Sequence, residues 1–376
     1  TNRTQTPTLG GIMDLMVWLW LVLGLVLLVG GAEVLVRGAS ALALRVGISP
    51  LVVGLTVVAF GTSSPELAVS ISSGLAGKAD IAVGNVVGSN IFNVLVVLGL
   101  AALIAPLVVQ QQLVRFEVPL VVGLSILILV MALDGSISPF DGILLFTGLI
   151  AYTYFVIQQS RRENAAIQSE YEAEFGEINS GLLSRLPIQL ACIVMGLALL
   201  SLGSTWLVDS AVSIARALEV SDAVIGLTII AAGTSFPELA TSLVAAWRGE
   251  RDIAVGNVVG SSLFNLLGIL GIAALVTPGG LSVATSILNF DIPVMIAVAI
   301  ACLPIFALAE GIPRWAGLAL LTYYLLYVTY LVLNATEHTA LESLNGIMLS
   351  FVLPLTSIIL LLLWSRGRAT APSDRQ

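Results

Sequence analysis

Charge, histidine and cysteine are all scarce in this chain. Only 10% of its 376 residues are charged, and it contains one histidine and two cysteines. A single histidine, His338, excludes a metal or catalytic centre built from several histidines. Cys192 and Cys302 both lie in apolar segments, which favours packing residues over a disulfide. The sequence has no basic patch or arginine-rich arm, so we expect no nucleic-acid partner, and no motif calls for a cofactor.

Long apolar runs take the place of charge. Hydrophobic residues make up 58% of the chain and its mean hydropathy is +1.04, which is typical of an all-α protein that crosses a membrane many times. A membrane-spanning helix needs about 20 mostly apolar residues. Eleven segments meet this need: 12–46, 50–76, 79–106, 116–133, 138–159, 186–217, 222–247, 251–277, 289–309, 314–334 and 344–365. The polar tail 1–11 lacks the signals of a cleaved leader, so we expect the first helix to stay in the membrane.

The segments divide into two halves of five helices. The halves cover 12–159 and 186–334, a polar linker loop at 160–185 joins them, and 335–376 holds an outer loop, an eleventh helix and a basic tail. Because five is odd, the second half enters the membrane from the opposite side, so the halves are inverted repeats. With the N-terminus outside, twelve arginines fall on the inner face and only Arg3, Lys78 and Arg216 fall on the outer face. This asymmetry is the one expected for membrane proteins.

One stretch of sequence occurs twice. Residues 54–99 and 226–271 align at a constant offset of 172 residues, with 28 of 46 positions identical. Each copy carries Gly-Thr-Ser-x-Pro-Glu inside an apolar run, which places Glu66 and Glu238 beside a proline. An ionisable side chain at bilayer depth costs about 3 kcal/mol or more, so such a residue is a functional-site hypothesis by default. Two of them, delivered by a duplication, predict a transporter with its site where the repeats meet.

The repeated motif gathers oxygen atoms. Thr62 and Ser63 precede Glu66 by four and three residues, so hydroxyls and carboxylate share one helix face. Pro65 donates no backbone N–H and clashes with the preceding turn, which is expected to break the helix and to free carbonyls near Ala59. A broken helix at membrane depth is tolerated only where it is buried in protein or lines a cavity. The second copy repeats the pattern with Thr234, Ser235, Pro237 and Ala231.

The helix after each motif adds Gly-Ser-x-x-Phe-Asn. Ser89 and Asn93 are four residues apart on one helix face, as are Ser261 and Asn265. If the repeats meet antiparallel, two carboxylates, two amides and several hydroxyls gather at the midplane. These are the hard oxygen ligands that calcium and sodium prefer, and the carboxylates also accept protons. Competition between ions for one set of ligands is a sufficient basis for exchange.

Other polar residues are paired across the repeat without pointing to ligation alone. Asn85 and Asn257 fit hydrogen bonding between helices as well as they fit a ligand role. Asp80 and Asp252 stand at the expected start of a helix, which favours N-terminal capping.

Three classes of protein could use such oxygens. The leading hypothesis is a secondary antiporter that moves calcium against a counter-ion. A calcium-permeable channel would use similar ligands, but the inverted repeat favours alternating access. An intramembrane enzyme would need a base or nucleophile with partners, and the sequence has no histidine near either motif, no HExxH and no cysteine pair.

Through its paired GTSxPE and GSxxFN motifs, the chain resembles the calcium/cation antiporter superfamily, in particular prokaryotic sodium/calcium exchanger-like proteins, over residues 12–334. The resemblance implies a ten-helix core, cation sites between helices 2, 3, 7 and 8, and access switched by sliding of helices 1 and 6. It also implies a monomer in the inner (plasma) membrane of a prokaryote. Glu66 and Glu238 would bridge calcium and sodium. The remaining implied ligands are Asn93 and Asn265 at the centre, Thr62, Ser63, Ser89 and the Ala59 carbonyl on one flank, and Thr234, Ser235, Ser261 and the Ala231 carbonyl on the other.

One feature departs from the family pattern. Exchangers of this type usually carry an acid at one of the two central positions, whereas Asn93 and Asn265 are both amides. Two carboxylates balance one calcium ion, two sodium ions or two protons. A calcium/proton antiporter that uses the same glutamates is therefore the alternative to sodium coupling.

Overall fold

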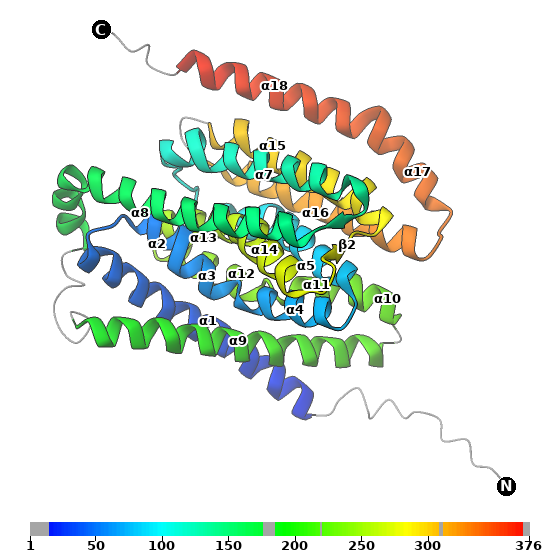
Figure 1. The fold of residues 1–376 in the computed structure, drawn as a ribbon, viewed down its shortest axis with the longest axis horizontal. Coiled ribbons are helices and arrows are strands. Elements are labelled where there is room, and N and C mark those ends of the chain that lie inside the picture. Colours follow the sequence, from blue (N-terminus) through cyan, green and yellow to red (C-terminus); the bar gives the residue numbers. More distant parts are fainter. Residues whose placement is uncertain (1–14, 176–184, 219, 308–310, 371–376) are drawn as a thin grey trace.

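The computed structural model describes residues 15–175, 185–218, 220–307 and 311–370. Expectations for the polar tail, for 176–184 and for the last six residues lie outside these ranges. Within them, nine helices are long and apolar enough to cross a membrane, and the bent pair Pro50–Thr62 and Ser64–Leu75 brings the number to ten when it is counted as one span. The helices form one bundle (Figure 1). The predicted all-helical, polytopic fold is therefore confirmed.

The helices of the first half include short π-helical stretches, in which the backbone bonds run one residue further than in an α-helix. Their bounds are α1 (Leu15–Val46), α2 (Pro50–Val53), a π-helix (Gly54–Val58), α3 (Ala59–Thr62), α4 (Ser64–Leu75), α5 (Ala79–Phe92), a π-helix (Asn93–Leu98), α6 (Gly99–Ile104), a π-helix (Leu113–Glu117), α7 (Val118–Met131), β1 (Ser136–Ile137) and α8 (Pro139–Phe175).

The second half repeats this order, and two further helices follow it. The bounds are α9 (Leu186–Ala217), α10 (Asp222–Ile225), a π-helix (Gly226–Ile230), α11 (Ala231–Gly233), α12 (Phe236–Trp247), α13 (Arg251–Leu263), a π-helix (Phe264–Ile269), α14 (Leu270–Val276), β2 (Leu281–Ser282), a π-helix (Ile287–Asp291), α15 (Ile292–Phe306), α16 (Arg314–Ala335), α17 (Ala340–Ile347), a π-helix (Met348–Val352) and α18 (Leu353–Thr370). The expected seventh span, 222–247, is thus built from four consecutive helical pieces.

The linker between the halves differs from the prediction. A loop was expected over 160–185, but α8 continues as a helix to Phe175. The residues from Arg161 to Phe175 are rich in Glu and Ala, contain no glycine or proline, and so extend a helix that has already been nucleated. Gly176 is the first helix-breaking residue after the span. Polarity marked the end of the membrane span correctly but not the end of the helix.

The two halves pack as antiparallel counterparts. Helices α1 and α9 lie along each other at the edge of the bundle (Figure 1). A Cβ added at Gly24 would meet Gly203, whereas one added at Gly31 would meet Gly196, so one helix runs up as the other runs down. Gly196 and Gly203 are also the positions that follow Gly24 and Gly31 by 172 residues. Antiparallel packing of equivalent helices is the geometry of an inverted repeat.

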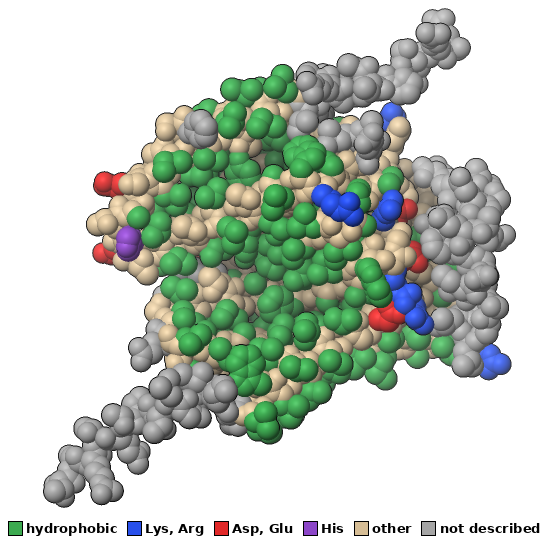
Figure 2. Space-filling model, turned by 180° about the vertical axis from the view of Figure 1, so that it is seen from behind, with side chains coloured by type: hydrophobic (Ala, Val, Ile, Leu, Met, Phe, Trp, Pro, Cys, Tyr) green, Lys and Arg blue, Asp and Glu red, His purple; other side chains and the backbone are tan. Residues whose placement is uncertain are grey.

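The centre of the bundle is formed by the spans that follow the repeated motifs. In the spans Ala79–Ile104 and Arg251–Val276, 78% and 89% of the apolar stretch is buried inside the protein. The corresponding shares for α1 and α9 are 22% and 28%. The outer helices therefore present most of their surface to lipid, and the space-filling view has a broad hydrophobic face (Figure 2). Helix α18 lies on the opposite side of the bundle from α1 and packs on α15 (Figure 1).

Contacts between loops show which connections between helices lie together at each end of the bundle. At one end β1 pairs antiparallel with β2, with Ser136 opposite Ser282. At the other end Leu107 pairs with Ile312, and Gln110 donates to Asp252 at 2.6 Å. On the face drawn in Figure 2, Lys and Arg side chains gather toward one end of the helices. This grouping matches the two sets of loops that the helix order predicts.

Helix α1 is also tied to the loop after α12 by polar contacts. Glu33 forms ion pairs with Arg37, at 2.7 Å, and with Arg248. Seven residues further along α1, the Ser40 hydroxyl donates to Glu250 Oε1 at 3.0 Å. These contacts hold the second half of α1 against α12, on which it packs.

Candidate cation-binding site

The span that carries each motif is broken at the motif. Helices α3 and α4 meet at an angle of 45°, and Ser63 between them has a ψ of 9°, outside the helical range. Ser235 adopts nearly the same backbone conformation before α12. Pro65 and Pro237 each occupy the second position of the helix that follows, where the missing N–H has no intrahelical role. The predicted helix breaks are confirmed.

Sequence reasoning did not anticipate the π-helical stretches beside these breaks. Gly54–Val58 precedes the first motif and Gly226–Ile230 precedes the second, at the same 172-residue offset. A second pair, Asn93–Leu98 and Phe264–Ile269, contains the two central asparagines. π-Helical turns occur often at functional sites because they redirect side chains and leave the backbone bonds of one turn irregular. Their only sequence signal is the repetition of both stretches.

Two buried carboxylates face each other across the repeats. Glu66 and Glu238 are 1% and 0% exposed. The Ser235 hydroxyl donates to Glu66 Oε1 at 3.0 Å, and the Ser63 hydroxyl donates to Glu238 Oε1 at 2.7 Å. Each glutamate is therefore held by the motif of the opposite repeat.

The second oxygen of each carboxylate has no hydrogen-bond partner among the described residues. Glu66 Oε2 and Glu238 Oε2 are both buried and unpaired. A buried anionic oxygen without a partner is costly unless a cation or a proton supplies one. The arrangement is therefore suited to cations that arrive from outside the protein.

The serines of the following helices join the same cluster. Ser261 lies 3.5 Å from Glu238 Oε1, and Ser89 lies 3.2 Å from the Ser235 hydroxyl. Both serines are fully buried. Ser63, Ser235 and Ser261 thus contact a glutamate directly, and Ser89 joins the cluster through Ser235.

The threonines are hydrogen-bonded to a pair of asparagines. Thr62 donates to Asn257 Oδ1 at 3.2 Å, and Thr234 donates to Asn85 Oδ1 at 3.3 Å. Each of these asparagines uses its amide nitrogen to reach the backbone carbonyl of the glutamate on its own repeat, at 3.2–3.3 Å. With both ends engaged, Asn85 and Asn257 connect the four motif helices, which agrees with the hydrogen-bonding interpretation.

Asn93 and Asn265 bring two further unpaired oxygens. They are 1% and 0% exposed, and the Oδ1 atom of each is buried without a partner among the described residues. Both side chains follow a buried site serine by four residues, on the same helix face. Two carboxylate and two amide oxygens are therefore free to accept a cation.

The two alanines are not equivalent in this structure. Ala59 is fully buried, and its carbonyl accepts the Ser63 N–H at 3.0 Å and the Thr62 hydroxyl at 3.4 Å. Ala231 is exposed, and the Ser235 N–H bonds instead to the carbonyl of Ala232. The expectation that the proline break frees the carbonyls near Ala59 was wrong, because the Ala59 carbonyl still accepts the Ser63 N–H of the following turn.

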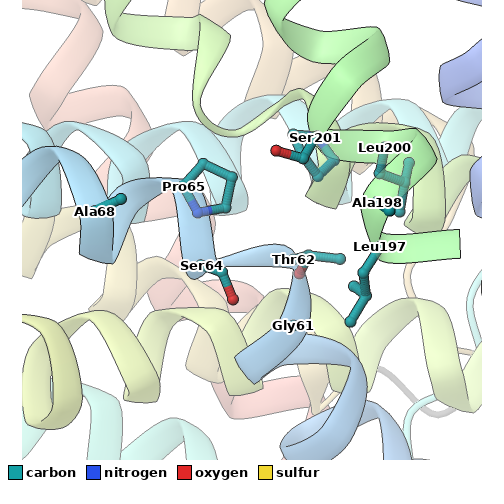
Figure 3. A pocket seen from close by; sticks show the side chains of 10 residues that line it. Gly61, Thr62, Ser64, Pro65, Ala68, Leu197, Ala198, Leu200 and Ser201 are labelled. Carbon is teal, nitrogen blue, oxygen red and sulfur yellow. The ribbon is translucent and has the colours of Figure 1, made fainter. Parts of the chain in front are cut away.

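A cavity of about 330 Å³ reaches the cluster from one side. It lies between the broken helix α3–α4 and α9, and Figure 3 places Thr62, Ser64 and Pro65 across it from Leu197 and Ser201. Thr62 both lines the cavity and bonds to Asn257. The cavity therefore ends at the polar cluster. At the equivalent position of the other half, α1 packs on α12.

The remaining acids do not add to this cluster. Asp80 and Asp252 stand at the second position of α5 and α13, not at the N-cap, so the capping interpretation was wrong in detail. Asp252 accepts a hydrogen bond from Gln110 instead. In the described ranges no group of three or more His, Cys, Asp or Glu residues could hold a metal ion. The acidic groups of this cluster are thus two carboxylates, and the oxygens around them are neutral.

Comparison with known proteins finds sodium/calcium exchangers among those similar to this chain. The model of a family described as sodium/calcium exchanger protein matches residues 16–158 and 188–333. The sodium/calcium exchanger MaX1 of Methanosarcina acetivorans is 33% identical over 84% of this chain and 98% of its own length. The inner membrane protein YrbG of Escherichia coli is 36% identical over 75% and 87%. A solved structure of the sodium-calcium exchanger NCX_Mj superimposes with a TM-score of 0.71 and 30% identity, over 84% of this chain and 99% of that one.

Proposed function

This chain belongs to the sodium/calcium exchanger protein family, and from that premise we propose that it exchanges calcium for sodium at Glu66 and Glu238. As a family member it is a multi-pass membrane transporter and not an enzyme. The observation that carries the proposal is the pair of buried glutamates, each bonded at one oxygen to the opposite repeat and unpaired at the other.

Calcium would bind where the unpaired oxygens converge. Calcium takes 6–8 oxygen ligands, and Glu66, Glu238, Asn93 and Asn265 offer four that are free within the described residues. Sodium would use the same carboxylates together with Thr62, Ser63, Ser89 and the Ala59 carbonyl on one flank, and Thr234, Ser235, Ser261 and the Ala231 carbonyl on the other. Because both ions need both glutamates, they cannot occupy the site together, which couples their movement.

Access would alternate through movement of α1 and α9 against the motif helices. The motif helices are joined to each other by hydrogen bonds across the repeats, whereas α1 and α9 lie at the edge of the bundle. The cavity beside α9 and the tight packing of α1 on α12 describe one of the two states. Exchange of these two arrangements would open the site to the other side.

The positive-inside rule assigns the sides of the membrane. With the N-terminus outside, the loops that carry Arg115, Arg248 and Arg314 face the cytoplasm of a prokaryote. We expect the protein to function as a monomer in the inner membrane, since both halves of the site come from one chain.

Transport into proteoliposomes tests the coupling. Uptake of calcium-45 is measured with an outward sodium gradient and, separately, with an outward proton gradient. We expect uptake driven by sodium. Uptake driven by protons alone would establish the calcium/proton antiporter, in which the two carboxylates carry protons. Calcium current with no counter-ion would establish a channel.

Neutral variants test the glutamates. We expect Glu66→Gln and Glu238→Gln each to reduce calcium uptake at least 100-fold, because an amide cannot balance a divalent charge in a low-dielectric site. Glu342→Gln, at an exposed position of α17, makes the same chemical change and should leave uptake intact. Near-normal uptake by either glutamate variant would disprove the proposed site.

A further inference from the structure

The two central asparagines are held differently, although they occupy equivalent positions. The amide nitrogen of Asn265 donates to Asn90 Oδ1 at 3.0 Å. The residue equivalent to Asn90 in the second repeat is Ser262, whose hydroxyl bonds to the carbonyl of Val258 in its own helix. Among the described residues, the amide nitrogen of Asn93 makes no matching bond to the Ser262 hydroxyl oxygen. The contact to Asn90 belongs to one half of the site only.

Asn90 is itself oriented by a neighbour. Its amide nitrogen contacts the sulfur of Met295 at 3.6 Å. A thioether sulfur accepts hydrogen bonds weakly and cannot donate them. The amide nitrogen of Asn90 therefore turns toward α15, and its oxygen turns toward Asn265. The residue equivalent to Met295 is Gly123, so this support is also missing from the other half.

The orientation of Asn90 decides which end of Asn265 faces the site. An amide offers an oxygen at one end and two N–H donors at the other. With its nitrogen bonded to Asn90, Asn265 keeps Oδ1 buried and unpaired, four residues after Ser261, which contacts Glu238. The reverse orientation would place N–H hydrogens, which carry partial positive charge, where the cation binds.

We propose that Asn90 is a positioning residue that holds the Asn265 amide with its oxygen toward the transported cation. The proposal rests on the exchange function proposed above and extends it to a residue that does not touch the ion. Met295 orients the amide of Asn90, and Asn90 orients the amide of Asn265. Asn265 then offers the cation a neutral oxygen.

The test compares Asn90→Ala and Asn90→Ser in two backgrounds. In the natural background we expect the calcium concentration for half-maximal uptake to rise about fivefold, because one oriented hydrogen bond is lost, with a maximal rate within about twofold of the natural protein. In an Asn265→Asp background the same changes should shift that concentration less than about twofold, since either oxygen of a carboxylate can face the ion and no N–H needs to be turned away. Ser262→Ala is the matched control and should have no effect in either background.

Folding and function are separated by a second measurement. The calcium- and sodium-dependent rise in unfolding temperature of the purified protein reports binding without transport. The positioning role is overturned if the Asn90 variants change the calcium concentration for half-maximal uptake equally in both backgrounds, or in neither. It is also overturned if both variants fail to fold while the natural protein still responds to cations. If the natural protein neither transports nor is stabilised by calcium or sodium, the exchange function fails and the positioning role fails with it.

Discussion

At the scale of single residues, the site is defined by what it lacks as much as by what it holds. Its buried charge is carried by Glu66 and Glu238 alone, and the central positions are the amides Asn93 and Asn265. Two negative charges are balanced by one calcium ion or by two sodium ions. Exchange of two sodium ions for one calcium ion moves no net charge, so transport by this chain is expected to be electroneutral.

A third carboxylate should change that balance. We expect Asn265→Asp to make calcium uptake depend on membrane potential, because a third negative charge favours a third sodium ion in the sodium-loaded site. The measurement is calcium-45 uptake with the potential set by potassium and valinomycin. Asn334→Asp, at an exposed position of α16, is the control and should remain insensitive. Uptake by Asn265→Asp that ignores the potential would contradict this charge argument.

Residue spacing and the repeat indicated which polar side chains gather. Ser63 and Ser235 were singled out by their position in each motif, and the structure bonds each to the glutamate of the opposite repeat. The role of Asn90 could not be found in this way. It depends on a contact with Asn265, 175 residues away, and on a sulfur atom of α15.

At the scale of elements, the outer pair α1 and α9 approach each other very closely. A Cβ at Gly31 would lie 2.9 Å from the carbonyl oxygen of Gly196, and one at Gly196 would lie 2.7 Å from the backbone nitrogen of Leu35. Only residues without a side chain fit at this crossing. The two helices therefore meet backbone to backbone at these glycines.

We expect Gly31→Ala to slow sodium-driven calcium uptake about tenfold or more and to lower the unfolding temperature, since the added methyl group forces two backbones apart. Gly30→Ala is a close control, because a Cβ there meets nothing within 4 Å. That change should be neutral or slightly stabilising, as alanine favours a helix more than glycine does. Equal transport by the two variants would show that close approach of α1 and α9 is not needed for exchange.

Elements were predicted most reliably where one residue type controls the backbone. The breaks at Pro65 and Pro237 follow from a missing N–H and appear where expected. The π-helical turns follow from packing between helices and carry no comparable signal. The helical extension of α8 to Phe175 was missed because polarity was taken as the sign of a loop.

At the scale of the whole molecule, the two repeats are similar in sequence but not in conformation. Helix α1 is tied to the loop after α12 through Glu33–Arg248 and Ser40–Glu250. The positions equivalent to these four residues are Thr205, Ala76, Val212 and Lys78, which cannot form the same ion pair. The polar contacts thus favour one of the two access states, the one in which α1 is docked and a cavity lies beside α9.

We expect Arg248→Gln to weaken this preference. The Glu33–Arg248 ion pair is partly exposed, and such a pair contributes ~0.5 kcal/mol. The population of the α1-docked state should therefore shift by about twofold. A cysteine at Ser64, which lines the cavity, reports that state through its rate of thiol labelling once Cys192 and Cys302 are replaced by alanine. The labelling rate should fall in Arg248→Gln. Arg251→Gln removes the same charge three residues further on and should leave the rate unchanged; a matching fall there would point to net charge instead of the contact with α1.

The hydrogen bonds between repeats also bear on how the protein is made. Glu66 enters the membrane while Ser235, its partner 169 residues later, has not yet been synthesised. A lone carboxylate at bilayer depth costs about 3 kcal/mol or more. The first half therefore cannot reach its final depth as a stable charged intermediate and must keep this carboxyl group hydrated or protonated until the second half is inserted. Completion of the site and completion of membrane insertion become one event, which ties biogenesis of the transporter to the synthesis of its second half.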